Sequence, residues 1–164
     1  MKIIFLDIDG VLNVRRQGRD RFGSLFHAEF MGGLKHIIDN TGAKIVISSS
    51  WRFNGLAEMK EMWVHRNLPG EVIDITPFTA QYENGEGASF MDRCERGCEI
   101  REWLKSNPCD DYVIVDDDID ILPSQIDRFV KCSGSDGHKH TDGYGLTKER
   151  AILAVSILNK KHQN

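Results

Sequence analysis

The chain has 164 residues, of which 40% are hydrophobic and 28% are charged, and these are ordinary proportions for a globular protein. This length is enough for a substantial core, so we expect one domain over residues 1–164. The formal net charge of −4 argues against a strongly basic nucleic-acid-binding protein, although it is compatible with a local basic patch. No run of 18 apolar residues and no secretory signal pattern occurs, so we expect a cytoplasmic protein without a membrane partner.

A short apolar segment at residues 3–6 is followed by two acidic residues. Its bulky, β-prone side chains predict a buried strand. Asp7 and Asp9 lie two positions apart, so an extended backbone directs both carboxylates to the same side. Carboxylates that close repel each other unless a proton or a cation lies between them, and Mg²⁺ is a hard cation that prefers oxygen ligands. A solvated turn is the plain alternative. An EF-hand is excluded because Gly10 comes too early in the loop.

The next segment predicts a loop and then a helix. Residues 15–23, RRQGRDRFG, contain four arginines and two glycines. This loop is either a solvated charged segment or a basic flap that attracts an anionic substrate to the acids. Apolar residues at helical spacing predict a helix over residues 26–40, with Ser24 as its N-cap and Gly42 after its end.

Three serines, a tryptophan and an arginine follow the second predicted strand, residues 43–47. A hydroxyl at the end of a parallel strand can donate to a phosphate oxygen, which makes Ser48 and Ser49 candidate ligands of an anion. Arg52 can bind a phosphate through two guanidinium N–H groups. Trp51 either stacks on a base or sugar or, as is more common, packs against its neighbours.

The second half of the chain continues the alternation of strands and helices. Loops are expected at residues 76–92 and 133–145, and we favour solvated side chains over metal ligands for His138 and His140 in the second loop. The other predicted elements are a helix at 56–67, a strand at 71–75, a helix from about 97 to 106, a strand at 112–115, a weaker strand at 127–132 and a last helix, capped by Thr147, that runs through 158.

Further charged residues adjoin the later elements. Arg96 precedes the predicted third helix, where it either reaches a phosphate and the acids around it or lies on the surface. Four acids fall within residues 116–120, after the fourth strand, and they require a counter-cation. The four cysteines, at 94, 98, 109 and 132, lack the spacing of a zinc site, so free thiols are expected.

The alternation of elements predicts an α/β fold with an open parallel sheet between two layers of helices. Ligands of such sheets bind at the carboxyl ends of the strands, where the strand order reverses. Three separate strand ends carry the candidate groups: Asp7 with Asp9, Ser48, and Asp116 with Asp117. We therefore expect these residues to meet at one edge of the sheet.

These motifs resemble those of the haloacid dehalogenase (HAD) superfamily of phosphohydrolases. The first motif, hydrophobic-DxDGV, matches residues 7–11, and the second, a strand followed by Ser or Thr, matches Ser48. The third motif, a basic residue at a helix start, fits Arg96, where lysine is commoner, and the fourth fits Asp116 and Asp117. The SSSWR, RGxEIxxWL, VDDDxD and DGxGLT segments resemble a narrower group, the HAD domains of bacterial Swiss-army-knife RNA-repair proteins and small standalone relatives.

The resemblance implies a HAD-like, Rossmannoid three-layer sandwich with a five-stranded, mainly parallel sheet and a minimal cap or none. It also implies a Mg²⁺-dependent phosphohydrolase that forms an aspartyl-phosphate. Asp7 is then the nucleophile and Asp9 the general acid and base. Ser48 and Arg96 neutralise the transferring phosphoryl group. An open site suits large substrates, such as a phosphorylated nucleic-acid end.

The metal ligands implied by the resemblance are the carboxylates of Asp7 and Asp117 and the backbone carbonyl of Asp9. Asp116 is a further candidate ligand, or it orients Arg96. Two other readings stay open. A receiver-like signalling domain accepts a phosphoryl group without catalysis, but its adjacent acids normally follow the first strand, where this chain has D-x-D. The other is a catalytically idle phosphate-binding module.

Overall fold

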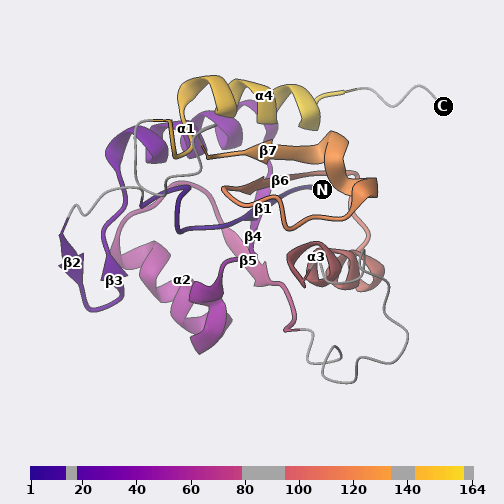
Figure 1. Cartoon of the computed structure of the whole chain (residues 1–164). Coiled ribbons are helices and arrows are strands. Elements are labelled where there is room, and N and C mark those ends of the chain that lie inside the picture. The colour runs from indigo at the N-terminus through magenta and orange to yellow at the C-terminus, as the bar shows by residue number, and fades with distance from the viewer. Residues whose placement is uncertain (14–17, 79–94, 134–142, 161–164) are drawn as a thin grey trace.

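The computed structural model describes residues 1–13, 18–78, 95–133 and 143–160 (Figure 1). Its centre is a five-stranded sheet in the order β5-β4-β1-β6-β7, and every neighbouring pair is parallel. The order reverses on the two sides of β1, so the first strand of the chain lies in the middle of the sheet. The strands are β1 (Lys2–Leu6), β4 (Lys44–Ile47), β5 (Val72–Ile75), β6 (Asp111–Asp116) and β7 (Phe129–Lys131).

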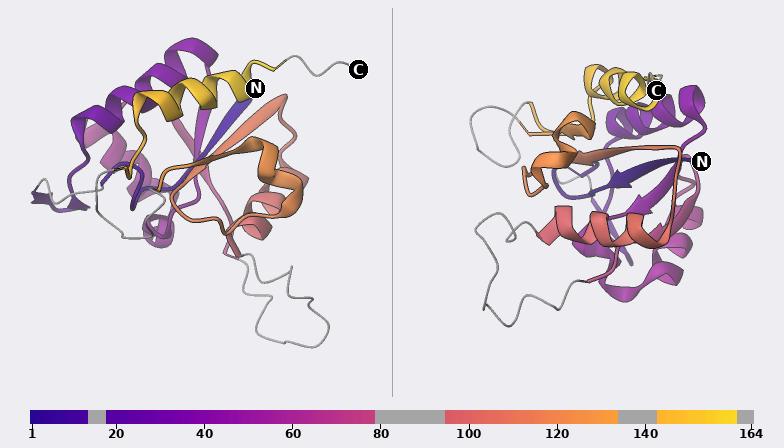
Figure 2. Two further views of the ribbon diagram at one scale, coloured as in Figure 1. Left: turned by 45° about the horizontal axis from the view of Figure 1, so that its top comes forward. Right: turned by 90° about the vertical axis from the view of Figure 1, so that its right-hand side faces the viewer.

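Helices cover both faces of this sheet, as Figure 2 shows for α1 and α4 on one side and α3 on the other. Side chains alternate along a strand, and β1 accordingly directs Ile4 and Leu6 to one core cluster and Ile3 and Phe5 to another. The first cluster contains residues of α1, α2 and α4, and the second contains Ile100 of α3. The helices are α1 (Ala28–Thr41), α2 (Leu56–His65), α3 (Glu95–Ser106) and α4 (Lys148–Leu158).

This arrangement confirms the predicted three-layer α/β fold. In the described part of the chain, the 3₁₀ helix η1 (Ser50–Asn54) follows β4 and the 3₁₀ helix η4 (Pro123–Arg128) precedes β7. A two-stranded hairpin of β2 (Arg19–Asp20) and β3 (Gly23–Ser24) lies between β1 and α1. Among the described residues, no helix is long and apolar enough to cross a membrane.

Three predicted boundaries are wrong. The third helix already includes Arg96, because α3 begins at Glu95 rather than at about residue 97. Ser24 belongs to the hairpin strand β3, and α1 begins after His27, which forms no side-chain capping bond. The last strand begins at Phe129, because 3₁₀ helix occupies the preceding residues. Two other terminal signals are confirmed: Gly42 ends α1 with a φ of 66°, and the Thr147 side chain accepts the backbone N–H of Arg150 at the start of α4.

Several expectations concern residues outside the described part of the chain. These are residues 15–17 of the arginine-rich loop, most of the 76–92 loop, Cys94, His138 and His140. The described cysteines, Cys98, Cys109 and Cys132, are free thiols, as expected.

Candidate active site

A pocket of about 480 Å³ lies at the carboxyl ends of the strands. It adjoins the boundary between β1 and β6, where the strand order reverses and where ligands of open α/β sheets bind. Its lining includes the predicted residues Asp7, Asp9, Arg96, Asp116 and Asp117, and also Ser50. The predicted convergence of the first, third and fourth motifs is therefore present.

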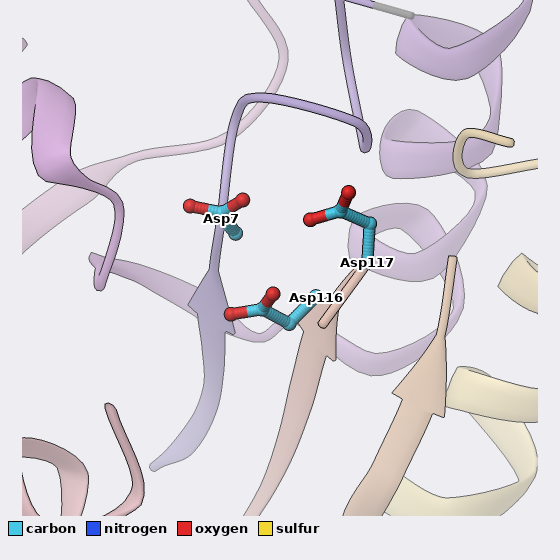
Figure 3. Close-up of side chains that lie close together, drawn as sticks. All are labelled: Asp7, Asp116 and Asp117. Carbon is cyan, nitrogen blue, oxygen red and sulfur yellow. The ribbon is translucent and has the colours of Figure 1, made fainter. Parts of the chain in front are cut away.

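Three carboxylates form the centre of this pocket. Asp7 directly follows β1 and extends its ladder through a backbone N–H bond of 3.0 Å to the Val115 carbonyl. Asp116 ends β6, and Asp117 follows it. One oxygen of each of the three carboxylates lies within 4.8 Å of the others, and Figure 3 shows them grouped beyond the ends of the two strands. This trio of Asp7, Asp116 and Asp117 is called the carboxylate cluster below.

Gly10 lets Asp117 approach the turn after β1. A Cβ atom at position 10 would lie 2.2 Å from an Asp117 carboxylate oxygen, and the backbone φ of 76° also favours glycine. The turn and the carboxylate are thus packed against each other without room for a side chain. Three hard oxygen donors in such a fixed arrangement fit a divalent cation such as Mg²⁺.

Burial makes the negative charge of the cluster costly. It raises the pKa of the Asp7 carboxyl, while the nearby Arg96 guanidinium and a hydrogen bond from Ser49 act in the opposite direction. Burial, followed by repulsion from Asp7, raises the pKa of Asp116 to about 8. The cluster therefore favours a bound proton or a cation at neutral pH.

Arg96 supplies one positive charge to this cluster. It lies in the first turn of α3, with Nη1 3.4 Å from Asp7 Oδ1 and Nε 3.5 Å from Asp116 Oδ2. Burial acts to lower the pKa of Arg96, but Asp116 and Asp7 outweigh it and the pKa is raised. Asp120 holds the start of the helix by accepting the Arg96 N–H through its side chain and the Gly97 N–H through its carbonyl. The structure thus places Arg96 between two acids rather than on the surface.

The carboxylate of Asp9 lies outside the carboxylate cluster. Trp51 Nε1 donates to its Oδ2 at 2.9 Å, and Asn13 Nδ2 donates to its Oδ1 at 2.7 Å. Asp9 lines the pocket and is exposed, so it keeps access to a ligand. In this structure the Asp9 carboxylate is therefore not positioned as a metal ligand. That the backbone carbonyl of Asp9 binds the metal stays a prediction. Sequence reasoning missed both donors, because no local pattern links Trp51 to Asp9.

The three serines after β4 have different surroundings. Ser48 is fully buried, and its hydroxyl has no hydrogen-bond partner among the residues that the structure describes. Ser49, also a predicted ligand of the anion, is buried and does not line the pocket; it bonds to Asp7, and its hydroxyl accepts the Trp51 backbone N–H at 3.4 Å. Ser50 is exposed and lines the pocket, which the sequence did not indicate.

Arg52 does not line the pocket, which corrects the expectation that it contacts a phosphate. Its side chain is only 3% exposed, and Nη2 forms a 2.6 Å ion pair with Glu99 of α3. Nη1 donates to the carbonyls of Ser48 and Ser49 at 2.7 and 2.8 Å, and Nε donates to the Thr76 carbonyl at 3.0 Å. Arg52 therefore joins the ends of β4 and β5 to α3 and holds the serine turn beside the pocket.

The described part of the arginine-rich loop is anchored to α2. Asp20 of the hairpin pairs with Arg66 at 2.6 Å, and this hydrogen-bonded partner lowers the pKa of Asp20 to about 2. Arg21 pairs with Glu61 at 2.6 Å and lies 4.5 Å from the centre of the Phe22 ring. Of the two arginines of this loop that the structure describes, Arg21 therefore contacts both Glu61 and the Phe22 ring, whereas Arg19 is exposed on β2.

Comparison with known proteins identifies one family. Residues 3–142 match the family described as the HAD domain in Swiss Army Knife RNA repair proteins. Searches of curated proteins and of solved structures found no match. The matched segment contains all the pocket residues discussed above, and it supports a HAD-type phosphohydrolase in general terms. Because this match spans most of its length, the chain belongs to the family of HAD domains found in Swiss Army Knife RNA repair proteins.

Proposed function

We propose that this protein is a Mg²⁺-dependent phosphomonoesterase that forms an aspartyl-phosphate on Asp7. The observation that carries the proposal is the carboxylate cluster, in which oxygens from two adjacent strand ends lie within 4.8 Å of one another, with Arg96 beside them. A purely structural role would not explain why acids are buried together at an electrostatic cost that raises the pKa of Asp116. A cation site next to a nucleophile gives this costly arrangement a chemical purpose.

The carboxylates of Asp7, Asp116 and Asp117 are the groups that would hold Mg²⁺. When bound, the ion would screen the negative charges of the carboxylates and the phosphate from each other. The donor set fits the ion, because all three groups are hard oxygen ligands and the contact with Gly10 fixes the position of Asp117.

The residues of the chain would carry the reaction in two steps. In the first, an Asp7 carboxylate oxygen forms a bond to phosphorus while the ester P–O bond breaks, and Asp9 gives a proton to the leaving oxygen. In the second, a water oxygen attacks the same phosphorus, Asp9 takes a proton from that water, and the bond from Asp7 to phosphorus breaks. The products are the free alcohol, inorganic phosphate and the original enzyme.

Two groups would stabilise the charge on the transferring phosphoryl oxygens. Arg96 is charged and borders the pocket at the contact with Asp7. Ser48 stays only a predicted hydroxyl donor: its Oγ has no partner among the described residues, but the residue is fully buried and does not line the pocket. Ser50 lines the pocket and is a second candidate for contact with the substrate.

We infer that the substrate is a nucleotide or a phosphorylated end of a nucleic acid. Between β1 and α1, the part of the chain that the structure describes forms a small hairpin and contains no folded cap domain. The family to which the chain belongs is described as the HAD domain in RNA repair proteins, and a phosphorylated nucleic-acid end is a substrate that fits this description.

The test is hydrolysis of p-nitrophenyl phosphate with and without Mg²⁺, followed by a screen of nucleotides, sugar phosphates, and RNA and DNA with 5′ or 3′ phosphates. Asp7→Asn should abolish turnover, whereas Asp39→Asn, which changes an exposed acid paired with Lys35, should not. Equal rates for wild type and Asp7→Asn would end the proposal. Stable phosphorylation by a small phosphodonor without turnover would instead favour a receiver-like domain, and phosphate binding alone would favour an idle module.

A further inference from the structure

Asp9 is held by two hydrogen-bond donors that come from different parts of the chain. Trp51 belongs to η1 after β4, and its indole N–H reaches Oδ2 at 2.9 Å. Asn13 lies at the end of the turn after β1, and its amide reaches Oδ1 at 2.7 Å. Both carboxylate oxygens are therefore fixed, although the residue itself is exposed at the pocket.

The indole that makes one of these bonds is itself constrained. Its ring packs against Phe26, with the ring centres 5.7 Å apart, and a Cβ atom on Gly23 of the hairpin would lie 3.1 Å from it. The backbone N–H of Trp51 donates to Ser49 Oγ. Trp51 thus has neighbours on the hairpin and on the serine turn, and these contacts fix the position from which its indole N–H donates to Asp9.

We propose that Trp51 and Asn13 are positioning residues for Asp9 that keep its carboxylate out of the carboxylate cluster and directed at the leaving-group oxygen. This inference rests on the proposed function. Asp9 and the cluster border the same pocket, so an unrestrained Asp9 side chain would be drawn to a cation bound there. Proton transfer needs a donor within hydrogen-bond reach of the reacting oxygen, so this displacement would remove acid catalysis without removing the nucleophile.

The competing explanation is that Trp51 only packs the hairpin against the sheet. The two explanations differ in their dependence on the leaving group. p-Nitrophenolate leaves without much help from an acid, whereas the phenolate of phenyl phosphate needs a proton. The kcat/KM value includes cleavage of the ester bond, so its ratio for the two esters reports acid catalysis. A packing defect would lower both values by the same factor.

The experiment compares wild type with Trp51→Phe, which keeps an aromatic ring and loses the N–H. We expect kcat/KM to fall about tenfold for phenyl phosphate and to change less than about threefold for p-nitrophenyl phosphate. Asn13→Ala removes the other donor without touching the indole packing and should show the same selectivity. Asp9→Asn provides the reference, with the same selectivity and a larger loss.

Trp103→Phe is the matched control, because Trp103 also donates its indole N–H to an aspartate, Asp74, at 2.6 Å, but away from the pocket. It should leave the ratio of the two esters unchanged. Equal losses on both esters for Trp51→Phe and Asn13→Ala, or no loss for either variant, would overturn the inference and leave the proposed function standing. Absence of Asp7-dependent hydrolysis in wild type would overturn both.

Discussion

Replacing Arg52 by methionine tests whether this arginine is structural. The change keeps an aliphatic chain but removes a guanidinium that forms a 2.6 Å ion pair with Glu99 and bonds to three backbone carbonyls. Both side chains of the pair are at most 10% exposed. Removal of one partner from a buried ion pair destabilises a protein by about 3–5 kcal/mol, because the remaining charge stays in a poorly solvated place.

We expect a value near the lower end, about 3 kcal/mol, because Glu99 also interacts with the positive charge of Arg96. For a protein of this size, that loss corresponds to a fall in Tm of about 6–12 °C. Urea denaturation followed by circular dichroism gives the free energy of unfolding. Arg21→Met is the matched control: its ion pair with Glu61 is also 2.6 Å long, but the side chains are 59% and 57% exposed. We expect it to cost at most about 1 kcal/mol.

The same variant separates structure from substrate binding. If Arg52 only holds the serine turn, the KM for a phosphate ester should change little at temperatures well below the Tm of the variant. Unchanged stability together with a strongly raised KM would refute the reasoning and indicate that Arg52 binds the substrate.

Three further predictions concern the metal site and the hairpin. Gly10→Ala should weaken Mg²⁺ binding about tenfold or more in isothermal titration calorimetry, since the new Cβ displaces Asp117; unchanged affinity would contradict this. Burial raises the pKa of Asp116 to about 8, above its unfolded value of about 3.9, so its contribution to stability is present at low pH and is lost as the pH rises toward 8. The Tm of the metal-free protein should therefore fall between pH 5 and about 8, Mg²⁺ should raise it more at the upper end, and Asp116→Asn should flatten the dependence. The Arg66 bond lowers the pKa of Asp20 to about 2, so the stability lost in Asp20→Asn at neutral pH should vanish as the pH falls through about 2.

The fold and the convergence of the main acids were predictable because they depend on regular patterns. Short β-prone runs alternating with helical periods predict a parallel sheet, and parallel strands end at one edge. The acids of Asp7 and Asp116 lie at the ends of such runs, so their meeting follows from topology. The helix stop at Gly42 was similarly local, because a left-handed residue needs glycine.

The errors occur where distant residues decide the outcome. Serine is a favoured N-cap residue, but Ser24 pairs with Arg19 and is part of the hairpin instead. The isolated sequence suggests an exposed, phosphate-binding Arg52, and only its contact with Glu99, which is 47 positions later, explains why it is buried. The donor role of Trp51 depends likewise on a carboxylate 42 positions away.

The position of β1 also has a consequence for how the site comes into being. This strand leads directly to Asp7, the proposed nucleophile, and precedes every other strand of the sheet in the sequence, yet it lies between β4 and β6. Its pairing with β6 joins residues more than 100 positions apart, so the carboxylate cluster is assembled only once β6 is available to pair with β1. A nascent polypeptide without β6 lacks two of the three carboxylates, so binding of the proposed metal should coincide with late folding rather than guide its beginning.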